Sequence, residues 1–180
     1  MPASLKEVST LAKFYGVKPY LREEARESQV KEKGQQVGIL HFATHAFFEP
    51  SQGLYSGIVL AEEKGEDGFL EAREIVDLNL HADLVVLSAC ETAKGKIHRG
   101  EGLIGLTWAF FVAGCASTIV SQWKVMDEST AELMTTFYSH LKAGASKAEA
   151  LRQAQLHLLR NRKFAHPFFW SPFILIGNWH

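Results

Sequence analysis

Two residue types that support nucleophilic catalysis follow two short apolar runs of this chain. Residues 37–43 (VGILHFA) lead to Thr44 and His45, and residues 84–89 (LVVLSA) lead to Cys90. In open α/β sheets, sites form at the carboxyl ends of the strands, where a histidine and a cysteine from neighbouring strands can meet. A nearby imidazolium lowers the pKa of a thiol by several units, and the thiolate is the nucleophile. His45 and Cys90 are therefore a candidate base and nucleophile.

The other cysteine and the nearest histidine fit structural roles better. Cys115 falls between an expected helix and an expected strand in apolar surroundings, so we expect an inert core residue. His41 lies inside the first run and is expected to be a hydrogen-bonded structural histidine. An arbitrary cysteine is also expected to be a buried, unreactive core residue. Cys90, however, leads into a glycine-rich segment (GKIHRGEG), which favours an accessible thiol.

Composition excludes several classes of protein. The 180 residues are 47% hydrophobic and 22% charged with a net charge of −1, which excludes a disordered tail and a collagen-like repeat and predicts no nucleic-acid or membrane partner. Two cysteines are too few for a disulfide framework, and no Cys/His cluster has zinc spacing, so neither a metal nor another cofactor is expected. The same cysteine usage, with no apolar signal segment at the N-terminus, favours a cytoplasmic location.

One uncharged stretch is long enough to span a bilayer. Residues 102–123 contain 22 consecutive residues without a formal charge. Its first half has apolar residues at helical spacing up to Gly114, and its second half is rich in Ser, Thr, Ile and Val, as a buried strand is. We therefore expect a core helix followed by a strand.

Alternating strand and helix signals predict one α/β domain over residues 1–180. Apolar runs at 37–43, 84–89, 116–123 and 173–177 are typical of a mostly parallel sheet, with helices at 127–141 and 147–160 and a short one within 68–80. Residues 54–61 and 68–70 are expected to form a hairpin. Residues 1–36 are expected to fold as a helix (4–15), a short strand (18–21) and a second helix (22–33).

Four motifs resemble those of the CHAT family, the bacterial caspase- and separase-like cysteine peptidases that are often fused to tetratricopeptide repeats. These are HFATHA, LSACETA, GEGLIGLTWAFFVAGCASTIVSQWKVMDEST and HPFFWSPFILIGNW, in this order. The resemblance covers about residues 19–179. It implies a caspase–hemoglobinase-like three-layer sandwich around a mostly parallel sheet. It also implies a cysteine endopeptidase with His45 as catalytic histidine and Cys90 as nucleophile.

The resemblance also implies an oxyanion hole and shows two departures. The backbone N–H groups of Ala46 and Cys90 would hold the oxyanion. The family usually has glycine where this chain has Ala46, a difference that matters only if the position needs a positive φ. The family domain usually begins further upstream, so the first strand of the sheet is expected to be missing from this chain.

The residues that bind substrate are less determined. Asp127 follows the run that ends at Trp123, and an acidic side chain there would favour a basic residue before the scissile bond. Asp127 can equally cap the helix that begins there. Glu91, next to Cys90, is a second candidate for substrate binding or anchors its own loop.

Two other functions stay open. The chain could be a regulatory or protein-interaction module without turnover, which binds a tetratricopeptide-repeat protein or a second copy through a sheet edge. It could also be another thiol-dependent hydrolase that uses the same His45 and Cys90 pair. The expected partner of the leading hypothesis is a protein or peptide substrate.

Overall fold

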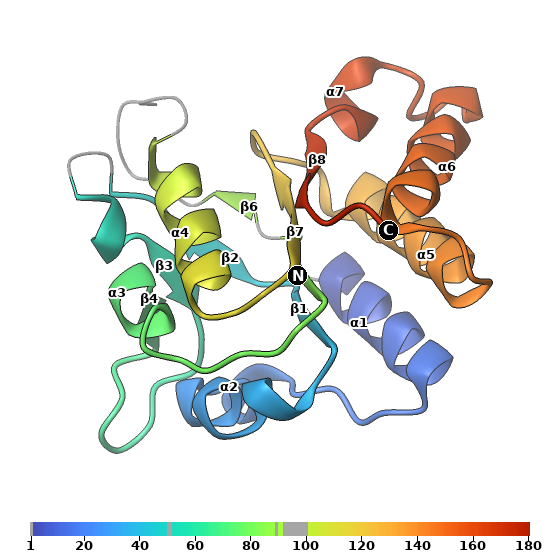
Figure 1. Ribbon diagram of the computed structural model, residues 1–180. Coiled ribbons are helices and arrows are strands. Elements are labelled where there is room, and N and C mark those ends of the chain that lie inside the picture. The colour runs from blue at the N-terminus through green and yellow to red at the C-terminus, as the bar shows by residue number, and fades with distance from the viewer. Residues whose placement is uncertain (1, 50–51, 89, 92–100) are drawn as a thin grey trace.

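The computed structural model describes residues 2–49, 52–88, 90–91 and 101–180, without the side chains of residues 2, 3, 90, 91 and 101–103 (Figure 1). The helices are α1 (Pro2–Tyr15), α2 (Glu27–Lys33), α3 (Ala72–Ile75), α4 (Glu101–Val112), α5 (Asp127–Lys142), α6 (Lys147–Arg160) and α7 (Pro167–Trp170). The strands are β1 (Ile39–Phe42), β2 (His45–Phe47), β3 (Gly57–Val59), β4 (Phe69–Glu71), β5 (Leu84–Leu87), β6 (Cys90–Glu91), β7 (Ser117–Ser121) and β8 (Phe173–Gly177). Short 3₁₀ turns cover Arg22–Glu24, Gly34–Gln36 and Gly53–Tyr55.

The central sheet has the order β1-β5-β7-β8. Strands β1, β5 and β7 are parallel, and β8 is antiparallel to β7, with Phe173 opposite Ser121 and Gly177 opposite Ser117. This confirms the mostly parallel α/β sheet. Because β8 runs the other way, Asn178 leaves it at the opposite edge from the residues that follow β1, β5 and β7.

A second, smaller sheet continues the first one. Its order is β4-β3-β2-β6, and its β3–β4 hairpin confirms the one predicted from residues 54–61 and 68–70. Strand β2 pairs parallel to β6 just as β1 pairs to β5. Both pairings keep an offset of 45 residues, with His41 opposite Val86 and His45 opposite Cys90. The two strands that lead to the candidate pair therefore stay side by side beyond the ends of β1 and β5.

Helices cover both faces of the central sheet, as the three-layer expectation requires (Figure 1). Successive residues of β5 point to opposite faces. Leu84 and Val86 pack in one cluster with α1, α5 and α6, and Val85 and Leu87 pack in another with α2, α3 and α4. The sheet thus forms the shared middle layer of two apolar cores.

The uncharged stretch forms a core helix and a central strand, as predicted. These are α4 and β7, joined at Gly114, whose φ of +102° suits glycine. A Cβ at Gly114 would lie 2.2 Å from the carbonyl oxygen of Leu80, so the turn also needs the missing side chain. Within the described residues, no helix is both long and apolar enough to cross a membrane.

The N-terminal region differs from the prediction. The first helix is present as α1, but residues 18–21 form no strand, and the expected helix 22–33 is split into the 3₁₀ turn Arg22–Glu24 and α2. The split occurs because the backbone around Ala25 pairs with the hairpin instead. The Ala61 N–H donates to the Ala25 carbonyl at 2.8 Å, and Arg26 forms a β-bridge with Ala61.

Helices α5 and α6 agree with the prediction except at one cap. Helix α6 begins after Ser146, whose side chain accepts a hydrogen bond from the Glu149 N–H. Helix α5 begins at Asp127, but its N-cap residue is Met126, which makes no side-chain cap bond. Asp127 is thus the first helical residue and not the cap. A carboxylate in the first turn is still favourable to the helix dipole.

Candidate functional site

The β2–β6 pairing brings the two candidate catalytic residues together. His45 of β2 is the direct Cα partner of Cys90 of β6, and Ala46 is the partner of Glu91. The side chains of Cys90 and Glu91, and residues 92–100 after them, lie outside the described part of the chain. What the structure gives is the backbone register, which places His45 and Cys90 as neighbours at the carboxyl edge of the sheet.

The imidazole of His45 is half-buried, and one of its two nitrogens is fully buried. Its Nδ1 is buried and has no hydrogen-bond partner among the residues that the structure describes. A buried polar atom without a partner is costly, and such atoms often mark functional sites. The Thr44 hydroxyl donates to the Val59 carbonyl at 2.7 Å, which ties the start of β2 to the hairpin.

Ala46 stands where the family that the motifs resemble usually has glycine, and the backbone there accommodates alanine. It is 2% exposed and lies inside the small sheet, opposite Ile58 on one side and Glu91 on the other. Among the described non-glycine residues, Arg22 alone has a positive φ, so the backbone at Ala46 does not require glycine.

The residues after β7 reach the same edge of the sheet. Since β7 is parallel to β5, Asp127 follows the carboxyl end of a central strand, as the sequence indicated. Sequence reasoning missed the apolar side chains beside it. Met126 and Phe168 are 43% and 44% exposed, and the Trp123 indole donates to the Phe168 carbonyl at 3.1 Å. The aromatic residues of the HPFFW and SQW segments were the available signal.

Cys115 is buried, as predicted for an inert core residue. It is 5% exposed in the cluster under α4, and burial raises the pKa of its thiol to about 11. At neutral pH this thiol stays protonated, so it is a poor nucleophile.

His41 is a partly buried, hydrogen-bonded histidine, as predicted. Its Nε2 lies 2.8 Å from Oε1 of Glu7, a carboxylate on α1 that is 2% exposed, and its Nδ1 lies 3.0 Å from the Tyr138 hydroxyl on α5. Burial raises the pKa of Tyr138 well above its usual value, so the phenol stays protonated.

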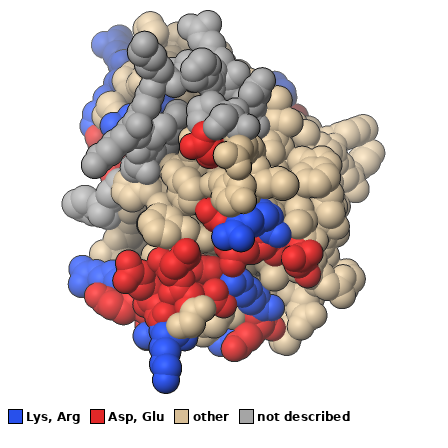
Figure 2. Space-filling model, turned by 90° about the vertical axis from the view of Figure 1, so that its left-hand side faces the viewer, with Lys and Arg blue, Asp and Glu red and all other residues tan. Residues whose placement is uncertain are grey.

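Three carboxylates with metal-ligand spacing gather around a lysine. Oxygens of Glu27, Glu66 and Glu74 lie within 4.8 Å of one another. Figure 2 shows that acidic side chains gather on one face of the molecule. The Lys31 ammonium lies 3.2, 2.7 and 3.0 Å from these three carboxylates. Although burial alone would lower the pKa of Lys31, its hydrogen bonds to Glu66, Glu74 and Glu27 raise it. The ammonium thus occupies the place of a cation and joins α2, the hairpin turn and α3.

Comparison with known proteins decides the family. A sequence model described as "CHAT domain" matches residues 1–178. The chain belongs to the CHAT family. Its α/β fold with a mostly parallel sheet is the caspase-like fold of that family.

Two curated relatives of this CHAT domain are long mammalian proteins. Tetratricopeptide repeat protein 28 of mouse is 25% identical over 211 residues, and the human protein of the same name is 26% identical over 216 residues. Each alignment covers 99% of this chain but only 9% and 8% of the relatives. Similar sequences are therefore not confined to bacteria, and this CHAT domain spans a small part of those proteins.

Proposed function

We propose that this CHAT domain is a cysteine endopeptidase that uses His45 and Cys90 as a catalytic pair. The observation that carries the proposal is the β2–β6 register, in which His45 is the direct partner of Cys90. Paired residues of neighbouring strands project to the same face of a sheet, so this register suits a proton transfer between the two side chains. The buried Nδ1 of His45 supports the same role.

The mechanism follows from the chemistry of the pair. The Cys90 thiolate adds to the scissile carbonyl, and the resulting tetrahedral intermediate collapses to a thioester as His45 protonates the departing amine. His45 then takes a proton from water, which attacks the thioester and releases the acid and the Cys90 thiolate, so that the thiolate and the protonated His45 are restored. We assign the oxyanion to the backbone N–H groups of Ala46 and Cys90, a contribution of about 3–4 kcal/mol per donor.

Peptide cleavage tests the proposal directly. A peptide library is incubated with the wild-type chain, with Cys90→Ala and with Cys115→Ala as the matched control. We expect cleavage by the wild type and Cys115→Ala and none by Cys90→Ala. Cleavage at the wild-type rate by Cys90→Ala would show that Cys90 is not the nucleophile.

We further propose that Asp127 and Glu91 bind substrate. A carboxylate at the edge where β7 ends favours a basic side chain before the scissile bond. Asp127→Asn should lower kcat/KM for an arginine substrate by about tenfold relative to a leucine substrate, which corresponds to the loss of one charge-assisted bond. Glu128→Gln is the control, because Glu128 pairs with Lys163 on the surface. An unchanged ratio for Asp127→Asn would remove Asp127 from the binding site.

A second candidate function is an interaction module within a repeat protein. The name of the relatives and a solvent-facing apolar stripe on α4 favour it. Ile104, Trp108 and Val112, spaced by four residues, are 67%, 51% and 50% exposed. A chain whose Cys90 reacts no faster than Cys115, and which cleaves no peptide, would support this function. Hydrolysis of small thioesters without peptide cleavage would instead indicate another thiol-dependent hydrolase.

A further inference from the structure

We propose that Glu7, acting through His41, is a positioning residue that holds the ends of β1 and β5 in the arrangement that sets His45 beside Cys90. The inference rests on the proposed function of this pair. It assigns a role to the N-terminal helix α1, which the catalytic chemistry itself does not use.

The first argument is the burial of Glu7. A glutamate is almost never fully buried unless it is paired. Glu7 is 2% exposed, and its Oε1 accepts a hydrogen bond from His41 Nε2 at 2.8 Å. The side chain of His41 is itself only 13% exposed. A carboxylate held in this way fixes both α1 and the imidazole.

The second argument is that the network is complete with a neutral imidazole. If Nε2 carries the proton and donates to Glu7, Nδ1 accepts from the Tyr138 hydroxyl, 3.0 Å away. Tyr138 is 1% exposed, and its ring packs edge-on against His41 with centroids 5.5 Å apart. The imidazole is thus fixed from α1 and from α5 at once, with each polar atom paired.

The third argument is the place of this network in the sheet. His41 lies four residues before His45 and pairs with Val86 of β5. The Ser88 hydroxyl lies 3.4 Å from His41 Nε2, and the Ser88 N–H donates to the Phe42 carbonyl at 3.1 Å. Ser88 comes two residues before Cys90. The network therefore contacts both strands where the central sheet breaks and the small sheet begins.

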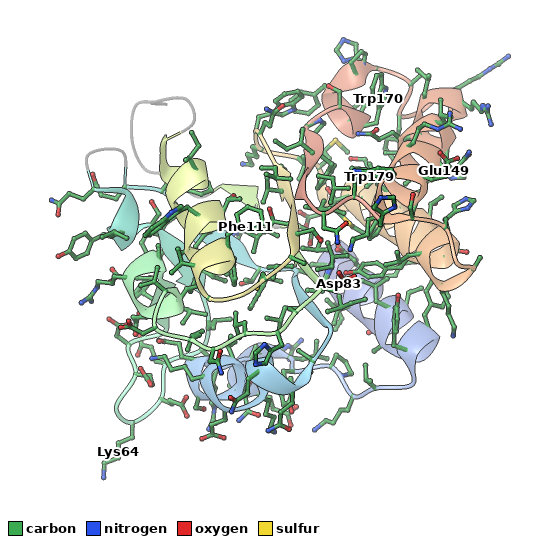
Figure 3. The ribbon with its side chains drawn as sticks, in the orientation of Figure 1. Lys64, Asp83, Phe111, Glu149, Trp170 and Trp179 are labelled. Carbon is green, nitrogen blue, oxygen red and sulfur yellow. The ribbon has the colours of Figure 1, made fainter. Side chains whose placement is uncertain are left out.

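Position and stability can be separated by the choice of variants. Glu7→Met removes the acceptor while keeping the length of the side chain, and Glu7→Gln retains an acceptor oxygen. Lys147→Met is the matched control. It breaks another ion pair of a buried charged residue, because Lys147 is 2% exposed and lies 2.8 and 2.9 Å from the two oxygens of Asp83, whose side chain is solvent-exposed. Asp83 precedes β5, at the end remote from Cys90 (Figure 3).

Two readouts are measured on the full chain. The first is the pH profile of Cys90 alkylation by iodoacetamide. We expect Glu7→Met to raise its midpoint by about one pH unit, which lowers the rate about tenfold well below the midpoint. Glu7→Gln should recover most of the wild-type profile, and Lys147→Met should leave it unchanged. The second is amide hydrogen exchange of residues 45–47, which Glu7→Met should accelerate selectively relative to β7 and β8.

The outcomes distinguish this inference from the proposed function. An ordinary thiol profile in the wild type would contradict the His45 and Cys90 pair, and exchange at residues 45–47 would then decide the positioning role by itself. An unchanged profile and unchanged exchange in Glu7→Met would overturn the inference alone. An equal shift in Lys147→Met would also overturn it. If Glu7→Met does not fold, Tyr138→Phe, which removes one hydroxyl, should shift both readouts in the same direction by less.

Discussion

At the scale of single residues, Cys115 provides a reference for any measurement on Cys90. Burial raises the pKa of the Cys115 thiol to about 11, so its thiolate fraction at pH 8 is about one in a thousand. In Cys90→Ala, the remaining thiol should therefore alkylate slowly up to pH 9 and accelerate as the pH rises toward 11. Mass spectrometry of the alkylated chain measures this. A midpoint near that of the same variant in urea would contradict the burial of Cys115.

Among the charged residues around the Glu27, Glu66 and Glu74 carboxylates, Lys31 is the one whose replacement should lower the free energy of unfolding most. Lys31→Met leaves Glu27, which is fully buried, without its cation. Because burial already raises the pKa of Glu27, an unpaired carboxylate there is unfavourable. We expect urea unfolding to show a loss of about 2 kcal/mol or more. Lys64→Met, at the exposed tip of the hairpin loop (Figure 3), should change stability by less than about 0.5 kcal/mol. Equal effects would contradict the role of Lys31.

The sequence indicated the types of the site residues but not their partners. His41 could be recognised as structural because it lies inside an apolar run. His45 could be recognised as a catalytic candidate because it follows that run. Glu7 could not be connected to His41, since 34 residues separate them and only the packing of α1 brings them together. The capping role of Asp127 was wrong because Met126 takes the N-cap position.

At the scale of elements, two helices end in glycines with similar backbone conformations and different surroundings. Gly114 after α4 has a φ of +102° and Gly144 after α5 a φ of +92°. A Cβ would lie 2.2 Å from the Leu80 carbonyl oxygen at Gly114, whereas nothing lies within 4 Å at Gly144.

This pair makes a prediction with a built-in control. Gly144→Ala should cost about 1–2 kcal/mol, because only the left-handed backbone is strained. Gly114→Ala should cost at least about 2 kcal/mol more, because the Leu80 backbone must also move. Thermal unfolding of both variants measures the difference. Equal losses would mean that α4 and Leu80 do not approach as closely as the structure shows.

Elements with their own periodicity were predictable, whereas two features set by backbone pairing, the direction of β8 and the break at Ala25, were not. Helix α6 was predicted from its apolar spacing and Ser146. The direction of β8 was not, since an apolar run such as FILIG reads the same in a parallel or an antiparallel strand. The break in the helix expected over residues 22–33 arises from backbone pairing of Ala25 with Ala61, which no local pattern reveals.

At the scale of the whole molecule, the two apolar clusters share one sheet and should unfold together. Phe137 is fully buried in the cluster under α5, and Phe110 is fully buried in the cluster under α4. Replacing either by alanine should cost about 3–5 kcal/mol. Because β5 contributes to both clusters, circular dichroism and fluorescence should report one coincident transition in each variant. Two separate transitions would show that the clusters fold independently.

The α/β class was predictable because strands and helices alternate along the chain. The continuation of β1 and β5 as β2 and β6 was not, because no clear sequence signal marks the interruption at residues 43–44 or the start of a second strand pair after it. That continuation nevertheless sets the register of His45 and Cys90, since the offset of 45 residues is kept across the break.

The central claim is that His45 and Cys90 work as a pair, and the pH dependence of one reaction tests it most directly. Cys90 alkylation is followed from pH 5 to pH 10 in Cys115→Ala and in the double variant that also carries His45→Ala. We predict a midpoint well below about 8.5, the pKa of an unperturbed thiol, in the first chain and a return toward that value in the second. The same midpoint near 8.5 in both chains would contradict the account.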